Sequence, residues 1–520
     1  MKPQKITQIS VVKEILAVLT SQEKTTIKTY LSSFIEKGRE SSNRSVKLFE
    51  ILTSLKDRKM PDEVVEKILL GNSKPNAFNH QVARLRDKIL EALIIDVNIE
   101  RDGSYPETTR VNIAIRKNIT QAQILQNRGA RKIAELMFEK VIEQCKKHEL
   151  FEELLIALRA LIRLKVLNEG DKQLQRLLNK YEKYDYYKNA VLRAEINYGK
   201  VISKTDFSSL HSTKTDWYRE MLDTMSDDFK KTRSIQIGYY YYYIETYYHQ
   251  LQRNYKSARR SLLSIQRLLE TGPVMNIPSM KGGVLVNLGE NDLFVGQFER
   301  SYETLEKSLQ YFKKDNFNYD QGVELMFYAK FYDGDYQMAF EIISQLLREP
   351  QSKNNFRKGK RSFLLASTFF MMGDFPITLR HLNMINPIVS DKDGWNLGIK
   401  ILHILTLIEL EEFDEATSKT DSLRKFFENG GHNHRVKMIC QLLQSLSYSG
   451  YDFKAVYQKE KSCLDMLEEK SGALSWQIKS SEMIIFPQWF FAKVSRQKFT
   501  QVIPSFQLSE NKNITVVNQE

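Results

Sequence analysis

The chain has 520 residues, 42% apolar and 27% charged, a composition that argues against a disordered protein, and its length argues against a single compact core. Its net charge of +13 is uneven, with +4 in residues 1–100, +10 in 101–270 and −1 in 271–520. The basic excess fits either a surface for acidic proteins, phosphates or nucleic acid, or a solvated cover of Lys and Arg side chains.

The first hundred residues predict a separate N-terminal helical domain, 1–100. Thr20 and Glu23 have the spacing of a helix-capping box, and apolar residues at helical spacing follow them. Further helices are predicted from about 45 to 55, from Pro61, and after Pro75.

The helix after Pro75 has an apolar stripe and a separate group of basic side chains. Helix, short turn and basic helix in this order are similar to a helix-turn-helix unit, which would place Arg84, Arg86 and Lys88 in contact with nucleic acid. Any two packed helices joined by a glycine turn give the same pattern, so a purely structural role is the competing interpretation.

Gly, Ser and Pro occur together at 101–106 and predict a domain boundary there. A helical repeat array is predicted beyond it, over residues 107–460. Breaks at 127–129, 168–171 and 208–215 suggest its early, degenerate hairpins.

A short turn recurs through the second half of the chain. Each copy has a glycine or polar break, an aromatic residue, and a small residue three positions later where two helices must approach closely. The turn aromatics follow one another at intervals of 43, 38, 39 and 38 residues, which predicts stacked helical hairpins. They are Tyr255, Phe298, Tyr336, Phe375 and Phe413, followed by Ala258, Ser301, Ala339, Thr378 and Ala416.

Residues 287–289 (Asn-Leu-Gly), 296–298 (Gly-Gln-Phe) and Ser301 together resemble a tetratricopeptide repeat (TPR). The resemblance implies that the Leu-Gly pair lies midway along a first helix and that the small residue lets a second helix pack against it. The spacing exceeds the family's usual repeat of about 34 residues, so we expect longer helices. The predicted fold is an all-α, right-handed α-solenoid of TPR-like helical hairpins that follows the N-terminal helical domain.

Five consecutive tyrosines, 239–243, are followed by Tyr247 and Tyr248. On a helix, Tyr240, Tyr243 and Tyr247 share one face. The resemblance implies that this face lines the concave groove, and the same offsets add Tyr328, Phe331, Phe363 and Phe370. Such a wall suits an extended peptide, and its rings would be partly exposed in the free protein. The alternative is that the rings only join adjacent hairpins.

Residues 461–500 predict C-terminal capping helices, because an apolar cluster at 484–491 can cover the last hairpin. The polar residues 501–520 predict a mobile tail. Cys145, Cys440 and Cys463 are too few and too scattered for a disulfide framework, and the chain shows neither a signal peptide nor a membrane span, so we predict a cytoplasmic protein.

The chain shows no nucleotide-binding fingerprint, nucleophile elbow or paired-histidine zinc motif. We therefore predict a protein that is not an enzyme and uses no cofactor and no metal. The predicted function is a protein-protein interaction scaffold that holds a partner peptide or helix, of unknown identity, in the concave groove. The alternative is a transcriptional or nucleic-acid-binding regulator in which the N-terminal unit contacts nucleic acid and the array senses a peptide.

Overall fold

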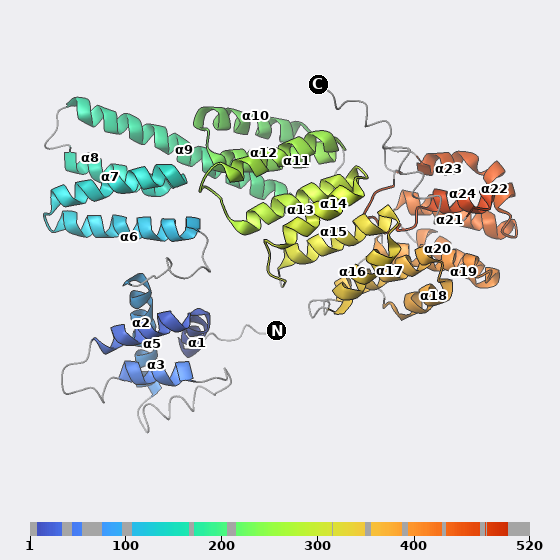
Figure 1. Cartoon of the computed structure of the whole chain (residues 1–520), viewed down its shortest axis with the longest axis horizontal. Coiled ribbons are helices and arrows are strands. Elements are labelled where there is room, and N and C mark those ends of the chain that lie inside the picture. Colours follow the sequence, from blue (N-terminus) through green and yellow to red (C-terminus); the bar gives the residue numbers. More distant parts are fainter. Residues whose placement is uncertain are drawn as a thin grey trace. The chain divides into compact units, whose positions relative to one another are not determined.

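The computed structural model describes residues 8–33, 44–54, 75–95, 107–165, 171–204, 215–314, 316–348, 355–386, 394–428, 433–468, 474 and 476–497. These residues form 23 α-helices and no strand (Figure 1). The all-α prediction is confirmed. The chain divides into two compact units, 1–182 and 183–520.

The first unit begins with four helices that share one apolar core. Helix α5 contacts the other three, and its predicted apolar stripe, including Phe78, Val82, Leu85 and Ile89, is buried. The predicted capping box is present at the start of α2, where the Glu23 backbone N–H donates to the Thr20 hydroxyl oxygen over 3.2 Å. The helices are α1 (Gln8–Val18), α2 (Ser21–Ser32), α3 (Arg44–Ser54) and α5 (Pro75–Ile95). The helix predicted from Pro61 lies outside the described residues.

Three helices that pack consecutively follow in the same unit, α6 (Glu107–Asn127), α7 (Arg131–His148) and α8 (Phe151–Lys165). The predicted break at 127–129 is confirmed, since α6 ends there. Helix α9 (Asp171–Lys204) has 34 residues and contains the division between the two units. The predicted boundary at 101–106 lies outside the described residues and stays a prediction.

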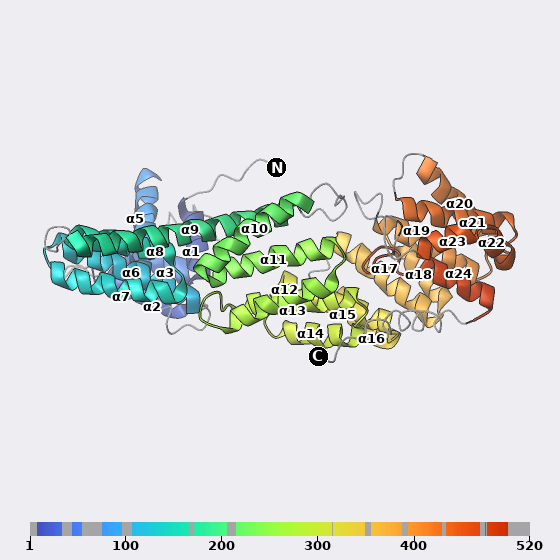
Figure 2. The same ribbon diagram turned by 90° about the horizontal axis from the view of Figure 1, so that it is seen from above.

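The second unit is a series of helical hairpins, in which each helix contacts the next along the chain (Figure 2). Its helices are α10 (Thr215–Thr232), α11 (Ile235–Leu251), α12 (Tyr255–Glu270), α13 (Pro278–Phe294), α14 (Phe298–Leu309), α15 (Phe317–Asp333), α16 (Tyr336–Arg348), α17 (Asn355–Met372), α18 (Phe375–Met384), α19 (Trp395–Glu409), α20 (Phe413–Glu428), α21 (His434–Tyr448), α22 (Phe453–Lys459), α23 (Lys461–Glu468) and α24 (Phe486–Ser495). This is the predicted array of TPR-like hairpins.

The five predicted turns share one backbone geometry. Each turn aromatic is the first residue of the second helix of its hairpin. Two positions earlier the backbone is left-handed, as at Gly334 with φ 91°. The next N–H then donates to a carbonyl five residues back, as from Asp335 to Lys330 over 3.0 Å, which satisfies an end carbonyl of the first helix. The same bond occurs at Asn254, Gln297, Asp374 and Glu412.

The small residue after each turn lies at a close helix crossing. All five, Ala258, Ser301, Ala339, Thr378 and Ala416, are 0% exposed. In the α13–α14 hairpin, the Ser301 hydroxyl donates to the Gly289 carbonyl oxygen over 2.7 Å, and a Cβ added to Gly289 would lie 2.5 Å from Leu305. The role that the resemblance implies for the Leu-Gly pair is therefore confirmed in this hairpin.

Two further turns were not predicted. Glu149 is left-handed before Phe151 begins α8, and this turn has the same geometry, since the Leu150 N–H donates to the Cys145 carbonyl oxygen. Before Phe453 begins α22, Gly450 and Tyr451 are both left-handed, and the Tyr451 N–H donates to the Leu446 carbonyl oxygen, one position earlier than in the other turns. The residue three positions into each helix is a buried Leu154 or Val456 in place of a small one. Both turns were missed because the predicted pattern requires a small residue at this position.

Candidate functional site

The first helices of the hairpins, α11, α13, α15, α17, α19 and α21, form what we call the inner face of the second unit. Two pairs of these helices touch, α13 with α15 and α17 with α19, so side chains from those neighbouring hairpins can act on one ligand. The predicted site residues lie on three of these helices, α11, α15 and α17.

On α11 the predicted tyrosines meet a further ring from α9. The centroid of the Tyr198 ring lies 5.2 Å from that of Tyr240 and 5.8 Å from that of Tyr243. Tyr247 packs in the same cluster. Tyr198, Tyr240 and Tyr247 are half-buried, but Tyr243 is buried at 7% exposed, so the expectation that its ring is partly exposed is wrong. We call these four residues the tyrosine wall, and its half-buried rings retain surface for a ligand.

The hydroxyl groups of the wall lie in a partly dry environment. Burial raises the pKa of Tyr240 and of Tyr247 to about 12, and it also raises the pKa of Tyr198 and Tyr243. The side-chain amide of Asn287 on α13 donates to the Tyr243 hydroxyl oxygen over 3.2 Å. The wall is therefore neutral at physiological pH, and its hydroxyl groups can donate or accept hydrogen bonds.

The four predicted groove residues on α15 and α17 are not available to a partner in this structure. Tyr328, Phe331, Phe363 and Phe370 are 0–2% exposed and belong to the large apolar core of the array. Phe331 and Phe370 pack edge-on against the turn aromatics Tyr336 and Phe375, with centroids 5.8 and 5.2 Å apart. The expectation that these rings are partly exposed is wrong, because they join adjacent hairpins, as the alternative interpretation proposed.

A segment near the C-terminal end of the described chain lies against the inner face. This segment, residues 476–485, has no regular secondary structure, and we call it the inner loop. Its Trp476 ring packs edge-on against Tyr332 of α15, with centroids 5.3 Å apart. The Tyr332 hydroxyl donates to the sulfur of Met483 over 3.7 Å. Ser481 and Met483 also line a small cavity with Phe363 of α17 and residues of α19.

Two ion pairs fasten the inner loop. Lys479 pairs with Glu290 of α13, and Arg435 of α21 binds both carboxylate oxygens of Glu482, over 2.5 and 2.9 Å. The guanidinium of Arg435 also donates to the Leu467 carbonyl oxygen over 2.7 Å. Neither pair could be predicted from neighbouring residues, because Lys479 lies 189 positions from Glu290 and Arg435 lies 47 positions from Glu482.

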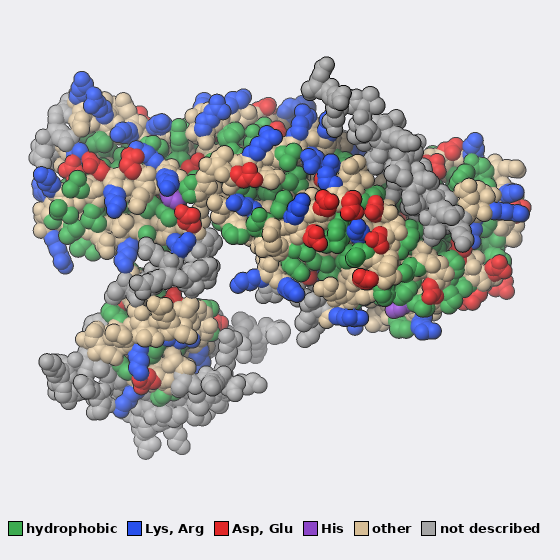
Figure 3. Space-filling view, viewed as in Figure 1, with side chains coloured by type: hydrophobic (Ala, Val, Ile, Leu, Met, Phe, Trp, Pro, Cys, Tyr) green, Lys and Arg blue, Asp and Glu red, His purple; other side chains and the backbone are tan. Residues whose placement is uncertain are grey.

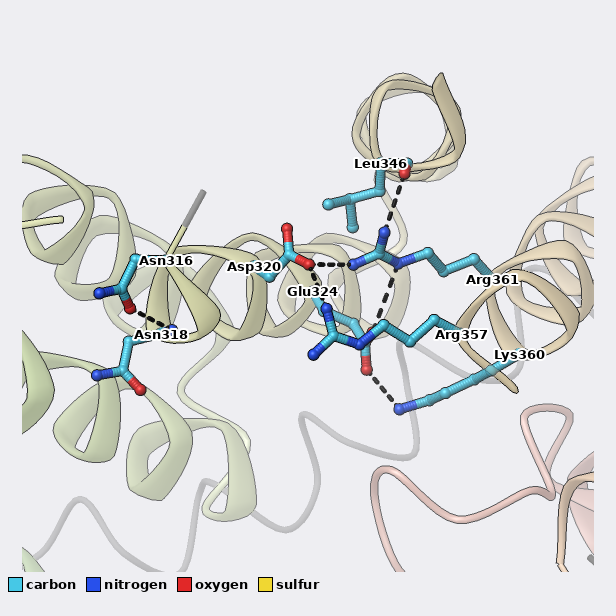
Figure 4. Close-up of polar contacts among 8 residues, drawn as sticks. All are labelled: Asn316, Asn318, Asp320, Glu324, Leu346, Arg357, Lys360 and Arg361. Atoms are coloured by element: carbon cyan, nitrogen blue, oxygen red, sulfur yellow. Dashed lines mark hydrogen bonds and ion pairs between the residues drawn. The ribbon is translucent and has the colours of Figure 1, made fainter. Parts of the chain in front are cut away.

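A second charged network joins α15, α16 and α17 (Figure 4). The Asp320 carboxylate accepts hydrogen bonds from Arg357 over 2.9 Å and from Arg361 over 3.0 Å. Arg361 also donates to the Leu346 carbonyl oxygen over 3.0 Å, and Glu324 pairs with Lys360. Because Asp320 and Arg361 are buried and each charge of the network has an opposite partner, we interpret the network as structural.

The two signs of charge are distributed differently over the second unit. Figure 3 shows acidic side chains gathered over α13–α15 and basic ones spread over α10–α12. Burial is the main cause of a raised pKa at Asp333, and Glu299 and Asp335 raise it further. Glu290 and Glu324 lie on α13 and α15, two helices of the inner face.

The predicted nucleic-acid residues lie on α5. Arg84 is exposed, while Arg86 and Lys88 are half-buried. Arg86 donates to Asp87 over 2.7 and 2.9 Å, and burial together with Arg84 lowers the pKa of Lys88. The turn that would complete a helix-turn-helix unit lies outside the described residues.

Within the described part of the chain, no group of three or more His, Cys, Asp or Glu side chains is placed to hold a metal ion. None of the described helices is both long enough and apolar enough to cross a bilayer. Cys145 and Cys440 are free and buried, and burial raises the pKa of their thiols to about 12 and about 11.

No protein-family model and no curated protein sequence matches the chain. Among solved structures, the apo form of RapI is 11% identical with a TM-score of 0.43, over 77% of this chain and 98% of that one. The apo form of the quorum sensor NprR from B. thuringiensis is 16% identical with a TM-score of 0.44, over 69% and 97%. A TPR protein from Parabacteroides merdae is 12% identical with a TM-score of 0.30, over 64% and 98%. Likeness at this level carries no information about ligands or activity.

Proposed function

We propose that this protein is a non-catalytic interaction scaffold that captures a partner peptide on the inner face, at the tyrosine wall. The observation that carries the proposal is that three rings from two helices, Tyr198, Tyr240 and Tyr247, are clustered yet only half-buried. Core aromatic rings of the same array, such as Phe331 at 1% exposed, have no such free surface.

Tyrosine suits this role for two reasons. Its large ring gives contact area at a small cost in conformational entropy, and its hydroxyl group can bond the main chain of an extended peptide. Both hydroxyl groups are neutral at physiological pH, as in any tyrosine, so a partner can bury Tyr240 and Tyr247 without the cost of desolvating a charge.

The alternative is a nucleic-acid-binding regulator, and α5 gives it little support. Arg86 is engaged by Asp87, and Lys88 is half-buried beside Glu91 on the same helix. Arg84 alone of the three predicted residues is exposed.

The test is selection of binders from a displayed library of random twelve-residue peptides against the full chain. We expect Tyr240→Ala and Tyr247→Ala each to lower the affinity for the selected peptides about tenfold or more, as the loss of an interface anchor does. Tyr302→Ala is the matched control, because Tyr302 is a half-buried tyrosine on the second helix α14. Peptides that bind all four proteins equally, or a library that yields no binder, would refute the proposal.

A further inference from the structure

The inner loop lies on the face where we place the partner. We propose that its tip, Trp476–Ser481, is a built-in occupant of the inner face, and that a partner peptide competes with it by presenting a basic side chain to Glu290. This inference rests on the proposed function for the identity of the competitor, but the occupancy of the face rests on the loop contacts alone.

The tip reaches across several hairpins in the manner of a bound peptide. Trp476 lies against α15, Lys479 pairs with α13, and Ser481 lies against α19. The chain reverses at the tip, where Lys479 is left-handed with φ 68° and the Ser480 N–H donates to the Gln477 carbonyl oxygen over 3.1 Å. The indole N–H of Trp476 donates to the Glu482 carbonyl oxygen over 2.9 Å and closes the loop.

The inner face is shaped to accept this backbone. A Cβ added to Gly398 of α19 would lie 2.1 Å from the Ser481 carbonyl oxygen. A glycine at this position therefore lets the main chain of the loop approach the helix more closely than any other residue would permit. The contact recognises a peptide backbone and not a particular side chain.

The base and the tip of the loop differ in how firmly they are held. Glu482, Met483, Ile484 and Ile485 are at most 7% exposed, and they continue into α24, whose Phe486 and Trp489 are 0% exposed. From Trp476 to Ser481 the residues are half-buried or exposed. The tip can thus leave the face while the base stays in the core.

Glu290 connects the tip with the tyrosine wall. Its carboxylate pairs with Lys479, and it is also close enough to raise the pKa of Tyr247. The side chain of Glu290 is 16% exposed, so loss of the Lys479 ammonium leaves a poorly solvated carboxylate. A peptide that displaces the tip must therefore supply a positive charge, such as a lysine side chain, to replace the Lys479 ammonium beside Glu290.

The experiment uses a synthetic, fluorescent peptide with the loop sequence 474–482 and a full-length variant in which residues 476–481 are replaced by alternating Gly and Ser. We expect the labelled peptide to bind this variant at least about tenfold more tightly than the parent protein, where the tethered tip has the advantage of effective concentration. A peptide with Glu in place of Lys479 should bind at least about tenfold more weakly. In the protein, Glu290→Gln should have the same effect, while Glu299→Gln on the exposed surface of α14 should have none.

A replaced variant that folds but does not bind the peptide overturns the proposal. A variant that fails to fold, judged by circular dichroism, makes the tip a structural element and also overturns it. Lys479→Gln keeps the test independent of folding, because it should accelerate hydrogen exchange of the tip amides and leave that of α24 unchanged.

The same labelled peptide separates this inference from the proposed function. Library peptides that bind the tyrosine wall but do not displace the loop peptide would refute the competition and leave the proposed function intact. A loop peptide that binds when no library peptide is selected would refute the proposed function and leave the occupancy intact.

Discussion

The guanidinium of Arg361 lies 3.0 Å from the carboxylate of Asp320, and the Arg361 side chain is 1% exposed (Figure 4). The pair joins α15 to α17, and the bond from Arg361 to the Leu346 carbonyl oxygen adds α16. Three consecutive helices of the array therefore depend on one buried cation.

We expect Asp320→Asn to lower the free energy of unfolding by roughly 3 to 5 kcal/mol, because the buried Arg361 loses its nearer carboxylate and keeps only Glu324, at 4.0 Å. Urea unfolding followed by circular dichroism measures the loss. Glu299→Gln is the control, since Glu299 is 62% exposed in its pair with Lys330 and such surface pairs contribute about 0 to 1 kcal/mol. Equal losses in the two variants would contradict the prediction.

Overpacking at a hairpin crossing should also destabilise the array. Ala339 is 0% exposed, so Ala339→Phe should cost about 1 to 3 kcal/mol of unfolding free energy. Gln337→Phe places the same ring at an exposed position of the same helix and should change little. If the Ala339 variant unfolds at the same urea concentration as the parent, the assigned helix crossing is wrong.

Tyr243 and Tyr247 should respond differently to truncation although they lie one helical turn apart. Tyr243 is 7% exposed and accepts a hydrogen bond from Asn287, so Tyr243→Ala should lower the free energy of unfolding by roughly 3 to 5 kcal/mol. Tyr247 is half-buried, and Tyr247→Ala should cost less in stability while weakening peptide binding. Thermal melting and peptide titration of the two variants test this assignment. It is wrong if Tyr247→Ala destabilises the protein more than Tyr243→Ala and weakens peptide binding less.

Alkaline pH should destabilise the tyrosine wall. The folded pKa of Tyr240 and Tyr247 is raised to about 12 by burial, whereas an unfolded tyrosine titrates near its ordinary pKa of about 10. Below about pH 10 both states bind the proton and stability is unaffected, while between about 10 and 12 the unfolded state ionises first and stability falls with rising pH. Urea unfolding at a series of pH values measures the slope, which Tyr240→Phe combined with Tyr247→Phe should reduce.

The left-handed turn residues predict opposite effects of glycine at two equivalent positions. Glu411 has φ 59°, which costs a residue with a Cβ about 1 kcal/mol or more, so Glu411→Gly should not destabilise the protein and should stabilise it by up to about 1 kcal/mol. Gly334 has φ 91°, and Gly334→Ala should destabilise by about 1 kcal/mol or more. Melting temperatures that move in the same direction for both variants would contradict the shared geometry.

The hairpins could be predicted from the sequence because their determinants are local. A left-handed residue, an aromatic residue and a small residue lie within six positions, as in Gly334, Tyr336 and Ala339, and the three constraints recur at the five predicted turns. Where one constraint was relaxed, as at Val456, the turn was missed. The division between the two units was not predicted, because it falls within the uninterrupted helix α9.

The candidate site could be predicted only in part. Helical spacing correctly placed Tyr240, Tyr243 and Tyr247 on one helix, but it could not show which rings neighbouring hairpins and the inner loop would bury. Tyr328 became inaccessible through packing in the core of the array. Glu290 and Lys479 have no neighbour in the sequence that marks them, because their pairing depends on the complete array.

The pairing of Lys479 with Glu290 also bears on how the array folds. In a stack of hairpins that touch only their neighbours, the hairpins at either end can fray alone, and unfolding need not be concerted. The inner loop adds a contact across 189 residues, so its formation must wait until the intervening hairpins are in place. We therefore expect the hairpins from α13 to α21 to unfold as one cooperative segment, with the last hairpin unfolding together with the middle of the array.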